Sequence, residues 1–494
     1  MHRPIVKSLV PQLVWFVFYY LIYLLVYYSI CVREGLHWDE VMDLDGSAND
    51  MYCAAGRWAL WLYKIAFGKG TQLLLAGLLA GAFISITLVI QAPLLKLKGW
   101  WLKALFGILT MASYQWAFAL HYSQQSDAVA LSILLCTLSA WLTYREGGLW
   151  QRILAAGMLV IALGVYQSMA LYYAAVWIAL FIANAHGTAL ATWLRQFAVT
   201  AAVSAAAVVS WWLLRSLFIE CIPPEVKGYA EEYQSSLTEW PLVLSASSIS
   251  EQLCMVWHYL RLSISNATGL GKASHLIFVA EWLPVAGLLL RFLTREKGLS
   301  RILLCLLCMM LWWIPFSLPF LLMTPGTGIR AWLAIPFSFA AVWVLWLGNM
   351  NIAKWGRAVI MCLALALMAN TACMVHRDAR KEAVLHKTTL STLTEMHQRA
   401  MELAAKSGIQ NPEILVCGSF NATEHPDINT KVFDGSHINW YGKQYHLTGI
   451  RKATKGDLET YSSQLEQMEK WPEAGSLART GETTILIRLP KGSK

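Results

Sequence analysis

Long apolar runs separated by short polar connections dominate the first three quarters of the chain. A membrane-spanning helix needs about 20 mainly apolar residues, because in lipid only a helix satisfies its own backbone hydrogen bonds. Runs of this kind predict eleven transmembrane helices, of which the fifth and sixth are short and almost continuous. Their approximate ranges are 9–32, 71–91, 104–120, 127–144, 153–166, 168–184, 197–219, 276–292, 302–323, 331–349 and 356–375.

The composition changes near residue 375. The whole chain is 57% hydrophobic and 14% charged, whereas an average soluble domain is about 25% charged. About 10% of residues 1–375 are charged, against about 25% of residues 376–494. We therefore expect an all-α polytopic membrane bundle over 1–375, with outer loops at 33–70 and 220–275, followed by a small α/β domain over 376–494.

The C-terminal segment has the pattern of such a small domain. A charged helical stretch is expected over 377–407, and apolar, β-branched runs predict strands at 413–418 and 483–489. We find no catalytic motif in this segment. It is expected to cap the membrane bundle rather than to carry the chemistry.

The basic residues give the bundle an orientation. Lys and Arg are enriched in cytoplasmic connections, and fourteen of them lie in alternate connections here. The remaining connections then face outward, as does the C-terminal domain, because eleven is odd. The net charge of +9 thus reflects topology, which excludes nucleic-acid binding as its explanation. The fourteen are Arg3, Lys7, Lys96, Lys98, Lys103, Arg145, Arg152, Arg195, Arg291, Arg295, Lys297, Arg301, Lys354 and Arg357.

The first outer loop is rich in carboxylates, with six between residues 33 and 57 interleaved with aromatic and apolar residues. A carboxylate at a lipid–water boundary suits general-base chemistry, since partial desolvation and neighbouring acids both raise its pKa. The alternative is that outer loops carry acids because the charge rule leaves them without Lys and Arg. The candidate catalytic residues are Asp39, Glu40, Asp43 and Asp45.

Cations on the predicted outer side are few, so each needs an anionic partner there. Arg57, Arg330 and Lys227 are candidates for binding a phosphate, for which a guanidinium offers a fork of donors. A salt bridge to a local acid or a lipid headgroup would explain them equally well. Polar residues at the outer ends of the middle segments are candidates for substrate binding. They are His121, Tyr122, Gln125, Asp127, Tyr166 and Gln167.

Three short motifs carry a family resemblance. An Asp-Glu pair at 39–40 precedes a Gly-Arg pair at 56–57 by about fifteen residues, and a Tyr-Gln pair stands at 166–167 between two middle segments. Together with the general layout, these motifs resemble the GT-C class of polyprenyl-phosphate-dependent glycosyltransferases. Within that class the chain is similar to the serotype-converting O-antigen glucosyltransferases of bacteria and their phages.

The resemblance implies a GT-C-like enzyme of the bacterial inner membrane with a periplasmic C-terminal domain. Such an enzyme moves glucose from undecaprenyl-phosphate-glucose to lipid-linked O-antigen, with inversion at the anomeric carbon. Its leaving phosphate needs positive charge, and its acceptor hydroxyl needs a carboxylate base. The base would be Asp39 or Glu40, although the family carries two aspartates there and a basic residue where Asp43 and Asp45 stand.

Other functions stay open at this point. The chain could be an O-antigen polymerase or ligase, a lipid or polysaccharide transporter such as a flippase, or an inactive relative. A transporter would show inverted repeats and charged pairs at the bilayer midplane, but the spans hold little charge besides Arg215 and Glu281.

The expected partners are the lipid-linked donor, the O-antigen acceptor and membrane lipids, together with a cognate flippase and a glucosyl-lipid synthase that supply the donor. No cofactor is expected. The acids would suit a divalent metal ion, but the histidine-poor first loop offers no spacing that indicates one.

Overall fold

The computed structural model describes residues 3–33, 36, 40, 41, 43, 44, 46, 49–68, 73–120, 122–145, 147–185, 190–228, 250, 254, 274–296, 298–316, 333–418 and 436–490. The chain divides into two compact units. Unit 1 comprises Met1–Val32 and Ala48–His376, and unit 2 comprises Arg33–Ser47 and Arg377–Lys494.

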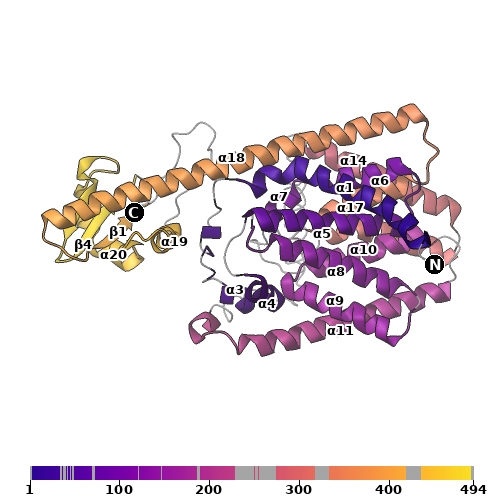
Figure 1. Ribbon diagram of the computed structural model, residues 1–494, viewed down its shortest axis with the longest axis horizontal. Helices are drawn as coiled ribbons and strands as arrows, with labels where there is room; N and C mark the ends of the chain where they lie inside the picture. Colours follow the sequence, from indigo (N-terminus) through magenta and orange to yellow (C-terminus); the bar gives the residue numbers. More distant parts are fainter. Residues whose placement is uncertain are drawn as a thin grey trace. The chain divides into compact units, whose positions relative to one another are not determined.

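Unit 1 is a bundle of helices (Figure 1). Over the residues that the structure describes, each apolar segment predicted from the sequence lies mainly in helix. The helices are α1 (Arg3–Cys31), α3 (Asn49–Ala54), α4 (Trp58–Phe67), α5 (Leu73–Leu94), α6 (Trp100–Met111), α7 (Gln115–Leu120), α8 (Ser126–Tyr144), α9 (Leu149–Val165), α10 (Met169–Asn184), α11 (Leu190–Ile219), α14 (Ser274–Arg295), α15 (Gly298–Trp313), the 3-10 helix η2 (Ile314–Phe316), α17 (Ile335–Leu347) and α18 (Lys354–Lys406).

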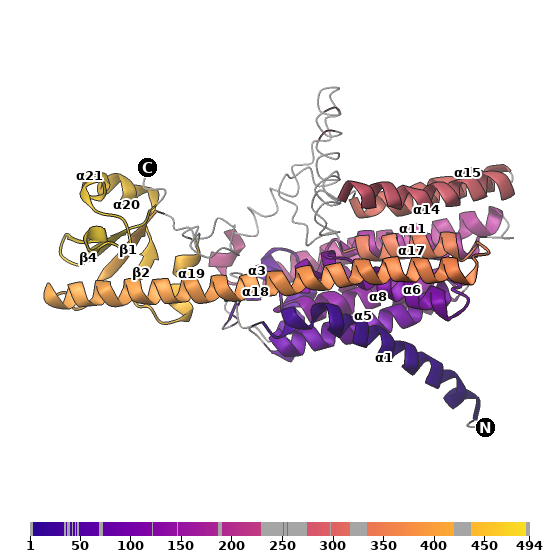
Figure 2. The same cartoon turned by 90° about the horizontal axis from the view of Figure 1, so that it is seen from above.

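Among the described residues, five helices are long and apolar enough to cross a membrane, so the chain is a membrane protein. Shorter apolar helices of 10–17 residues pack with them, and α14 and α15 lie side by side (Figure 2). The total of eleven spans stays a prediction. The five are Val10–Cys31, Leu73–Leu94, Ser126–Tyr144, Ala191–Ile219 and the helix Lys354–Lys406.

The third predicted segment is broken. α6 ends at Met111 and α7 begins at Gln115. The carbonyls exposed by this break are satisfied from distant helices: the Tyr27 hydroxyl lies 2.7 Å from the carbonyl oxygens of Met111 and Ser113. The Thr371 hydroxyl donates to the Ala112 carbonyl at 2.7 Å. Buried backbone groups need such partners, so α1 and α18 make the break tolerable.

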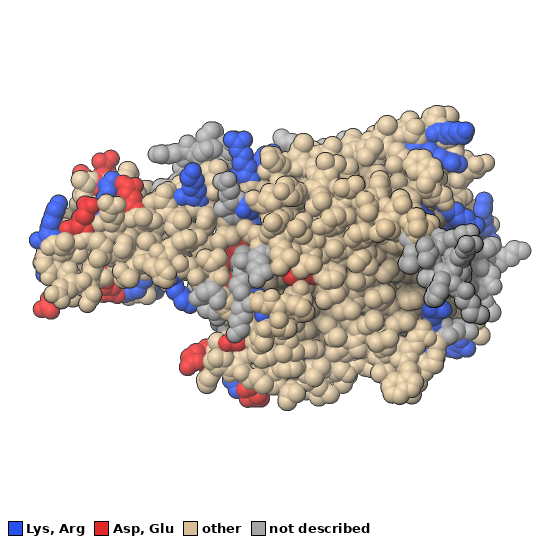
Figure 3. Space-filling view, in the orientation of Figure 1, with Lys and Arg blue, Asp and Glu red and all other residues tan. Residues whose placement is uncertain are grey.

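The two ends of unit 1 differ in charge. Lys and Arg side chains gather at one end of the bundle, and acidic side chains lie toward the other (Figure 3). The helix ends at the first of these, which we term the basic end, also present three exposed tryptophans, Trp100, Trp150 and Trp355. Tryptophan concentrates at membrane–water interfaces, so these rings indicate one boundary of the bilayer.

Unit 2 is a small α/β fold. Its sheet contains β1 (Glu413–Cys417), β2 (Ile450–Lys452), β3 (Leu477–Thr480) and β4 (Thr484–Arg488) in the order β2-β1-β4-β3. β1 pairs in parallel with β2 and β4, and β3 runs antiparallel to β4. The accompanying helices are α19 (Ser436–Gln444), α20 (Lys455–Thr460) and α21 (Ser462–Gln467), with the 3-10 helix η4 (Ala474–Ser476).

Helices cover both faces of this sheet. Ile414 and Val416 pack on one face with Leu393 and Met396 of α18, and Leu415 packs on the other face with Leu465 and Met468. Both faces of β1 and β4 are therefore buried, which explains why these two strands read as continuous apolar runs in the sequence. The predicted strands at 413–418 and 483–489 are confirmed, whereas β2 and β3 were not predicted.

The chain passes between the units three times, after Val32, after Ser47 and after His376. The last predicted span and the charged stretch after it form one 53-residue helix, α18, which crosses the unit boundary after His376. The segment 33–47 of the first loop belongs to unit 2, because Val41 is fully buried in the core that α18 forms with the sheet. Composition alone assigns that segment to the membrane domain.

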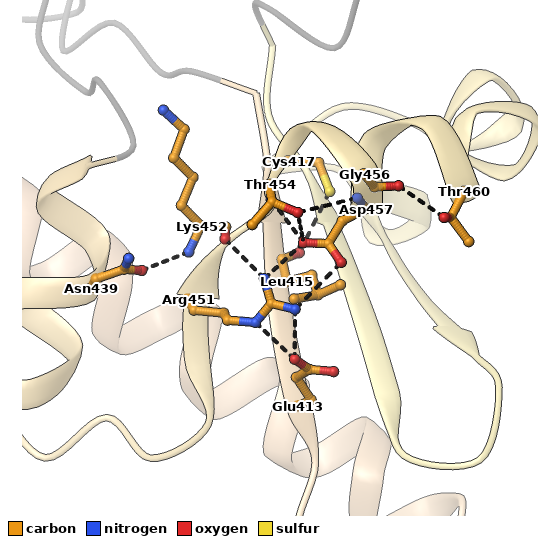
Figure 4. Close-up of polar contacts among 10 residues, drawn as sticks. All are labelled: Glu413, Leu415, Cys417, Asn439, Arg451, Lys452, Thr454, Gly456, Asp457 and Thr460. Carbon is orange, nitrogen blue, oxygen red and sulfur yellow. Dashed lines mark hydrogen bonds and ion pairs between the residues drawn. The ribbon is translucent and has the colours of Figure 1, made fainter.

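A polar network ties β1 and β2 to α20 in unit 2 (Figure 4). The Arg451 guanidinium donates to Glu413 and to Asp457, each at 2.7 Å. Asp457 also accepts from the backbone and side chain of Thr454, which completes a capping box at the start of α20. The positive charge of Arg451 is thus neutralised by two carboxylates within the fold.

Candidate active site

The Gly-Arg pair forms the turn between α3 and α4. The amide of Gly56 donates to the Cys53 carbonyl at 2.9 Å, and that of Arg57 donates to the Tyr52 carbonyl at 2.8 Å. This is the Schellman arrangement, which requires a left-handed residue after the helix, and Gly56 has φ +78°. Glycine is therefore needed for the turn that sets the direction of Arg57.

Arg57 lies among neutral partners. Its Nη1 donates to Oε1 of Gln125 at 3.1 Å, and its guanidinium carbon lies 4.5 Å from the centre of the Tyr166 ring. Nε of Arg57 is buried and has no hydrogen-bond partner in the described structure. No described carboxylate pairs with Arg57, so its charge and one donor are available to an anion.

Side chains that come from later in the chain hydrogen-bond to the backbone of the turn between α3 and α4. Nε2 of Gln167 donates to the Ala55 carbonyl at 2.7 Å, and Nε1 of Trp211 donates to the Gly56 carbonyl at 3.2 Å. A Cβ atom at Gly56 would lie 2.9 Å from Nε2 of Gln167 and 3.1 Å from Nε of Arg215. The close approach, as well as φ, excludes a larger residue at Gly56.

The carboxylate of Asp127 lies near this turn, on helix α8. Oδ2 of Asp127, in the first turn of α8, accepts a hydrogen bond from the Tyr63 hydroxyl at 2.8 Å. Burial and the neighbouring Asp127 raise the pKa of Tyr63 above its usual value, so the phenol remains a donor at neutral pH. Asp127 and Gln125 are two residues apart, which places this pair next to the partner of Arg57.

The structure thus brings together residues that are far apart in the sequence. Arg57 contacts both Gln125 and Tyr166, and Gln167 donates to the carbonyl of the residue before Gly56. Asp127 adjoins them, and Tyr122 lies partly buried in the turn that leads into α8. We refer to Arg57, Gln125, Asp127, Tyr166 and Gln167 as the Arg57 cluster.

Other predicted site residues lie elsewhere. Lys227 forms an ion pair with Glu220 at 2.7 Å on the protein surface, which matches the salt-bridge alternative considered for it. His121 and Arg330 lie outside the described residues, as do Asp39 and Asp45. None of these four is placed relative to the Arg57 cluster.

Two of the four candidate acids are described, and both belong to unit 2. Glu40 is fully buried and its carboxylate pairs with the buried Arg33. Asp43 is fully buried as well, two residues after the core residue Val41. These positions anchor the acidic segment in the fold of unit 2.

Sequence reasoning missed several residues of this site. Tyr63, Trp211 and Arg215 contact the cluster or its turn, but none was selected as a candidate. The sequence did indicate Arg215, since a cation inside an apolar run is a functional candidate by default. No sequence feature indicated Tyr63 or Trp211, because aromatic residues are common in every segment of this chain. In the described part of the chain, no three His, Cys, Asp or Glu side chains come together as metal ligands would.

Residues 36–347 match the family described as glucosyl transferase GtrII. This range is more than half of the chain and includes the whole Arg57 cluster. The chain belongs to the GtrII family of glucosyl transferases. The resemblance inferred from the three motifs is therefore confirmed, and with it a glycosyltransferase activity on a sugar donor and an acceptor glycan. No curated protein and no solved structure matches the chain.

Proposed function

We propose that this protein is an inverting glucosyltransferase that moves glucose from undecaprenyl-phosphate-glucose to lipid-linked O-antigen, at the periplasmic face of a bacterial inner membrane. Family membership supports the transfer of glucose. The apolar helices support a lipid-linked donor, because such a substrate reaches the protein through the bilayer. Nucleotide sugars are confined to the cytoplasm, so an outward-facing transferase requires a donor of this kind.

The single observation that carries the proposal is the set of contacts around the Arg57 guanidinium. Its guanidinium is held by an amide and an aromatic ring, with a buried Nε that has no partner in the described structure. Arg57 is partly buried, and a cation that is partly removed from water without a carboxylate partner gains from binding an anion. The departing polyprenyl phosphate would supply that anion, and its developing charge would be stabilised where it forms.

The proposed reaction also needs a base. The acceptor hydroxyl attacks the anomeric carbon, the bond to the donor phosphate breaks, and a carboxylate takes the hydroxyl proton. We propose Asp39 or Glu40 for this role, with Asp43 and Asp45 in reserve. A β-linked donor would yield an α-glucoside. The reaction as proposed uses no cofactor, and EDTA is expected to leave the rate unchanged.

The function is tested by direct transfer. Purified full-length protein is incubated with lipid-phosphate-[14C]glucose and a lipid-linked O-antigen acceptor, and the label in the acceptor is measured. We expect label in the polysaccharide and free polyprenyl phosphate in equal amounts. Polymerised O-antigen without glucose, or donor moved across vesicles without transfer, would instead identify the polymerase or flippase alternatives.

Amide substitutions test the base. Asp39→Asn, Glu40→Gln, Asp43→Asn and Asp45→Asn remove one charge each with little change in shape. Because Glu40 pairs with a buried arginine, Glu40→Gln is also expected to destabilise unit 2, so folding is measured alongside transfer. The assignment fails if all four variants, folded as the wild type is, still glucosylate O-antigen at the wild-type rate.

The outward orientation is tested by labelling. Cys221 is exposed just beyond the C-terminal end of α11, and Gly148, at the start of α9, has open space where a side chain would stand. In a background without other cysteines, Cys221 should react with a membrane-impermeant maleimide in intact cells. A cysteine introduced by Gly148→Cys should react only after lysis. The reverse pattern would place the Arg57 cluster in the cytoplasm.

A further inference from the structure

A cavity of about 290 Å³ lies at the basic end of unit 1. It is enclosed by the turn between α5 and α6, the C-terminal ends of α10 and α17, and the region where α14 leads into α15. The 16 residues of α10 run from the Tyr166-Gln167 turn to this cavity, a length of about 24 Å at 1.5 Å per residue. The cavity is therefore distinct from the Arg57 cluster.

The lining of this cavity is amphipathic. Its walls include the buried side chains of Leu102, Leu288 and Phe292. Three cations, Lys96, Lys98 and Arg291, line it against one carboxylate, Glu296. The cavity thus combines an excess of positive charge with apolar walls, as a phosphate attached to a hydrocarbon chain requires.

Lys96 has an unusual backbone conformation. It has φ +54°, and the amides of Lys96 and Leu97 donate to the carbonyls of Pro93 and Ala92 at 3.0 and 3.1 Å. This is the left-handed position that ends a helix, where glycine is usual and where a residue with a Cβ costs about 1–2 kcal/mol. The enrichment of cations in cytoplasmic connections accounts for a lysine in this turn but not for its place at the left-handed position, which a ligand for the ammonium group would explain.

The depth of the cavity in the membrane indicates which kind of molecule binds there. Trp100 begins α6, two residues after Lys98, and its ring is 70% exposed. Trp355, near the start of α18 at the same basic end, is 76% exposed. Exposed tryptophan rings of membrane proteins lie among the lipid headgroups, which puts Lys96 and Lys98 at the depth of the lipid phosphates.

We propose that this cavity is a binding site for the phosphate of an anionic membrane lipid. The phosphate lies among Lys96, Lys98 and Arg291, and the first part of the hydrocarbon chain packs on the apolar walls. Basic pockets between membrane helices bind anionic headgroups in this way. The site does not depend on the proposed glucosyl transfer, because it involves no residue of the Arg57 cluster.

The experiment measures lipid binding to the purified full-length protein by native mass spectrometry. Phosphatidylglycerol and phosphatidylcholine are titrated separately, and inorganic phosphate is added as a competitor. Lys98→Gln with Arg291→Gln should weaken phosphatidylglycerol binding by about tenfold, with phosphatidylcholine unaffected. Arg152→Gln is the matched control, since Arg152 is a basic-end cation that does not line the cavity, and it should bind as the wild type does.

Lys96→Gly separates a binding role from a structural one. Glycine suits φ +54°, so this variant should unfold at the same or a higher temperature while binding phosphatidylglycerol severalfold more weakly. His446→Gly is the control, because His446 has φ +56° in unit 2 and its replacement should not alter lipid binding. A lower unfolding temperature for Lys96→Gly with unchanged lipid binding would overturn the proposal.

The arms of the experiment also distinguish two sources of phosphate. If millimolar inorganic phosphate displaces phosphatidylglycerol from the wild type, the site recognises the phosphate group alone. If it does not, the hydrocarbon walls contribute and the ligand is the lipid. Both results support a site for an anionic lipid. Phosphatidylcholine carries the same phosphate beside a compensating positive charge, so equal binding of the two lipids to the wild type and the double variant refutes the proposal.

Discussion

Two arginines in this protein, Arg57 in unit 1 and Arg451 in unit 2, show how the same side chain can serve binding or stability. Arg451 donates to Glu413 and Asp457, so its charge is neutralised within the fold. Arg57 contacts a neutral amide and an aromatic ring, and its Nε has no partner in the described structure. An arginine whose charge is satisfied stabilises the fold, whereas one left with unsatisfied charge and donors is prepared for an anionic ligand.

The largest effect should come from removing the Arg57 charge. Arg57→Gln should lower kcat for glucosyl transfer by about 10²–10³-fold, the loss typical of a group that stabilises developing negative charge. The unfolding temperature should change little, because Arg57 forms no ion pair with any residue that the structure describes. Transfer kinetics and thermal unfolding of the full-length protein measure both quantities.

Arg451→Gln is the control for this comparison. It should lower the stability of unit 2 and leave transfer within about twofold of the wild type, since neither Glu413 nor Asp457 belongs to the Arg57 cluster. If Arg57→Gln destabilised the protein as much as Arg451→Gln and left kcat unchanged, the distinction between the two arginines would be lost.

A smaller effect is expected from Gly56→Ala. A Cβ at φ +78° costs about 1–2 kcal/mol, and here it would also press on the Gln167 amide at 2.9 Å. The displaced turn should lower transfer by about tenfold through misplacement of Arg57. Gly481→Ala is a matched control, because Gly481 has φ +62° and open space around its Cα. It should show the backbone cost without the loss of transfer.

Removing the Tyr166 ring should impair transfer less than Gly56→Ala does. Its contact with the Arg57 guanidinium is a cation–π interaction, worth about 1 kcal/mol in a partly desolvated site. Tyr166→Leu should therefore raise KM for the donor severalfold, and Tyr166→Phe, which keeps the ring, should behave as the wild type does. A large defect in Tyr166→Phe would show instead that the hydroxyl is the group that matters.

The smallest expected effect is the pH dependence of the stability of unit 2. Hydrogen bonds from Arg451 hold the pKa of Asp457 well below its usual value, which is about 3.9. A depressed carboxyl pKa contributes stability that is present above the usual pKa and is lost as the pH falls below it. Because both partners are partly exposed to solvent, this contribution should be less than about 1 kcal/mol.

Hydrogen exchange at the amides of β1 and β4 in the full-length protein, between pH 6 and pH 3, measures this contribution. Protection should fall as the pH drops below about 4 in the wild type, and less steeply in Asp457→Asn. Identical pH profiles would show that the Arg451 network does not respond to the charge of Asp457.

Local sequence pattern accounts for most of the helices. Where the structure describes them, the predicted apolar segments are mainly helical, because helix formation and apolar content are properties of consecutive residues. The break between α6 and α7 is not predicted, since its carbonyls are satisfied by Tyr27 and Thr371. Those partners are more than 80 residues away from it along the chain in each direction.

The candidate site was predictable in part. Arg57, Tyr166 and Gln167 stand in motifs that can be seen in the sequence, and Gln125 and Asp127 are polar residues at the start of an apolar segment. The role of Lys227 as a surface ion pair was one of two alternatives that the sequence left open. Arg215 was recognisable as a charge within an apolar run, but its position beside Gly56 depends on how α11 packs.

The amino-acid sequence by itself determined the helical membrane segments, the strands β1 and β4, and the family, because these depend on neighbouring residues or on short motifs. Only the tertiary structure decided that the acidic segment 33–47 belongs to unit 2, through the burial of Val41 among residues that lie over 350 positions later. It also decided that Arg57 has no carboxylate partner among the described residues, while Arg451 has two. Charge pairing is a property of distances between residues remote in sequence, and folding alone sets those distances.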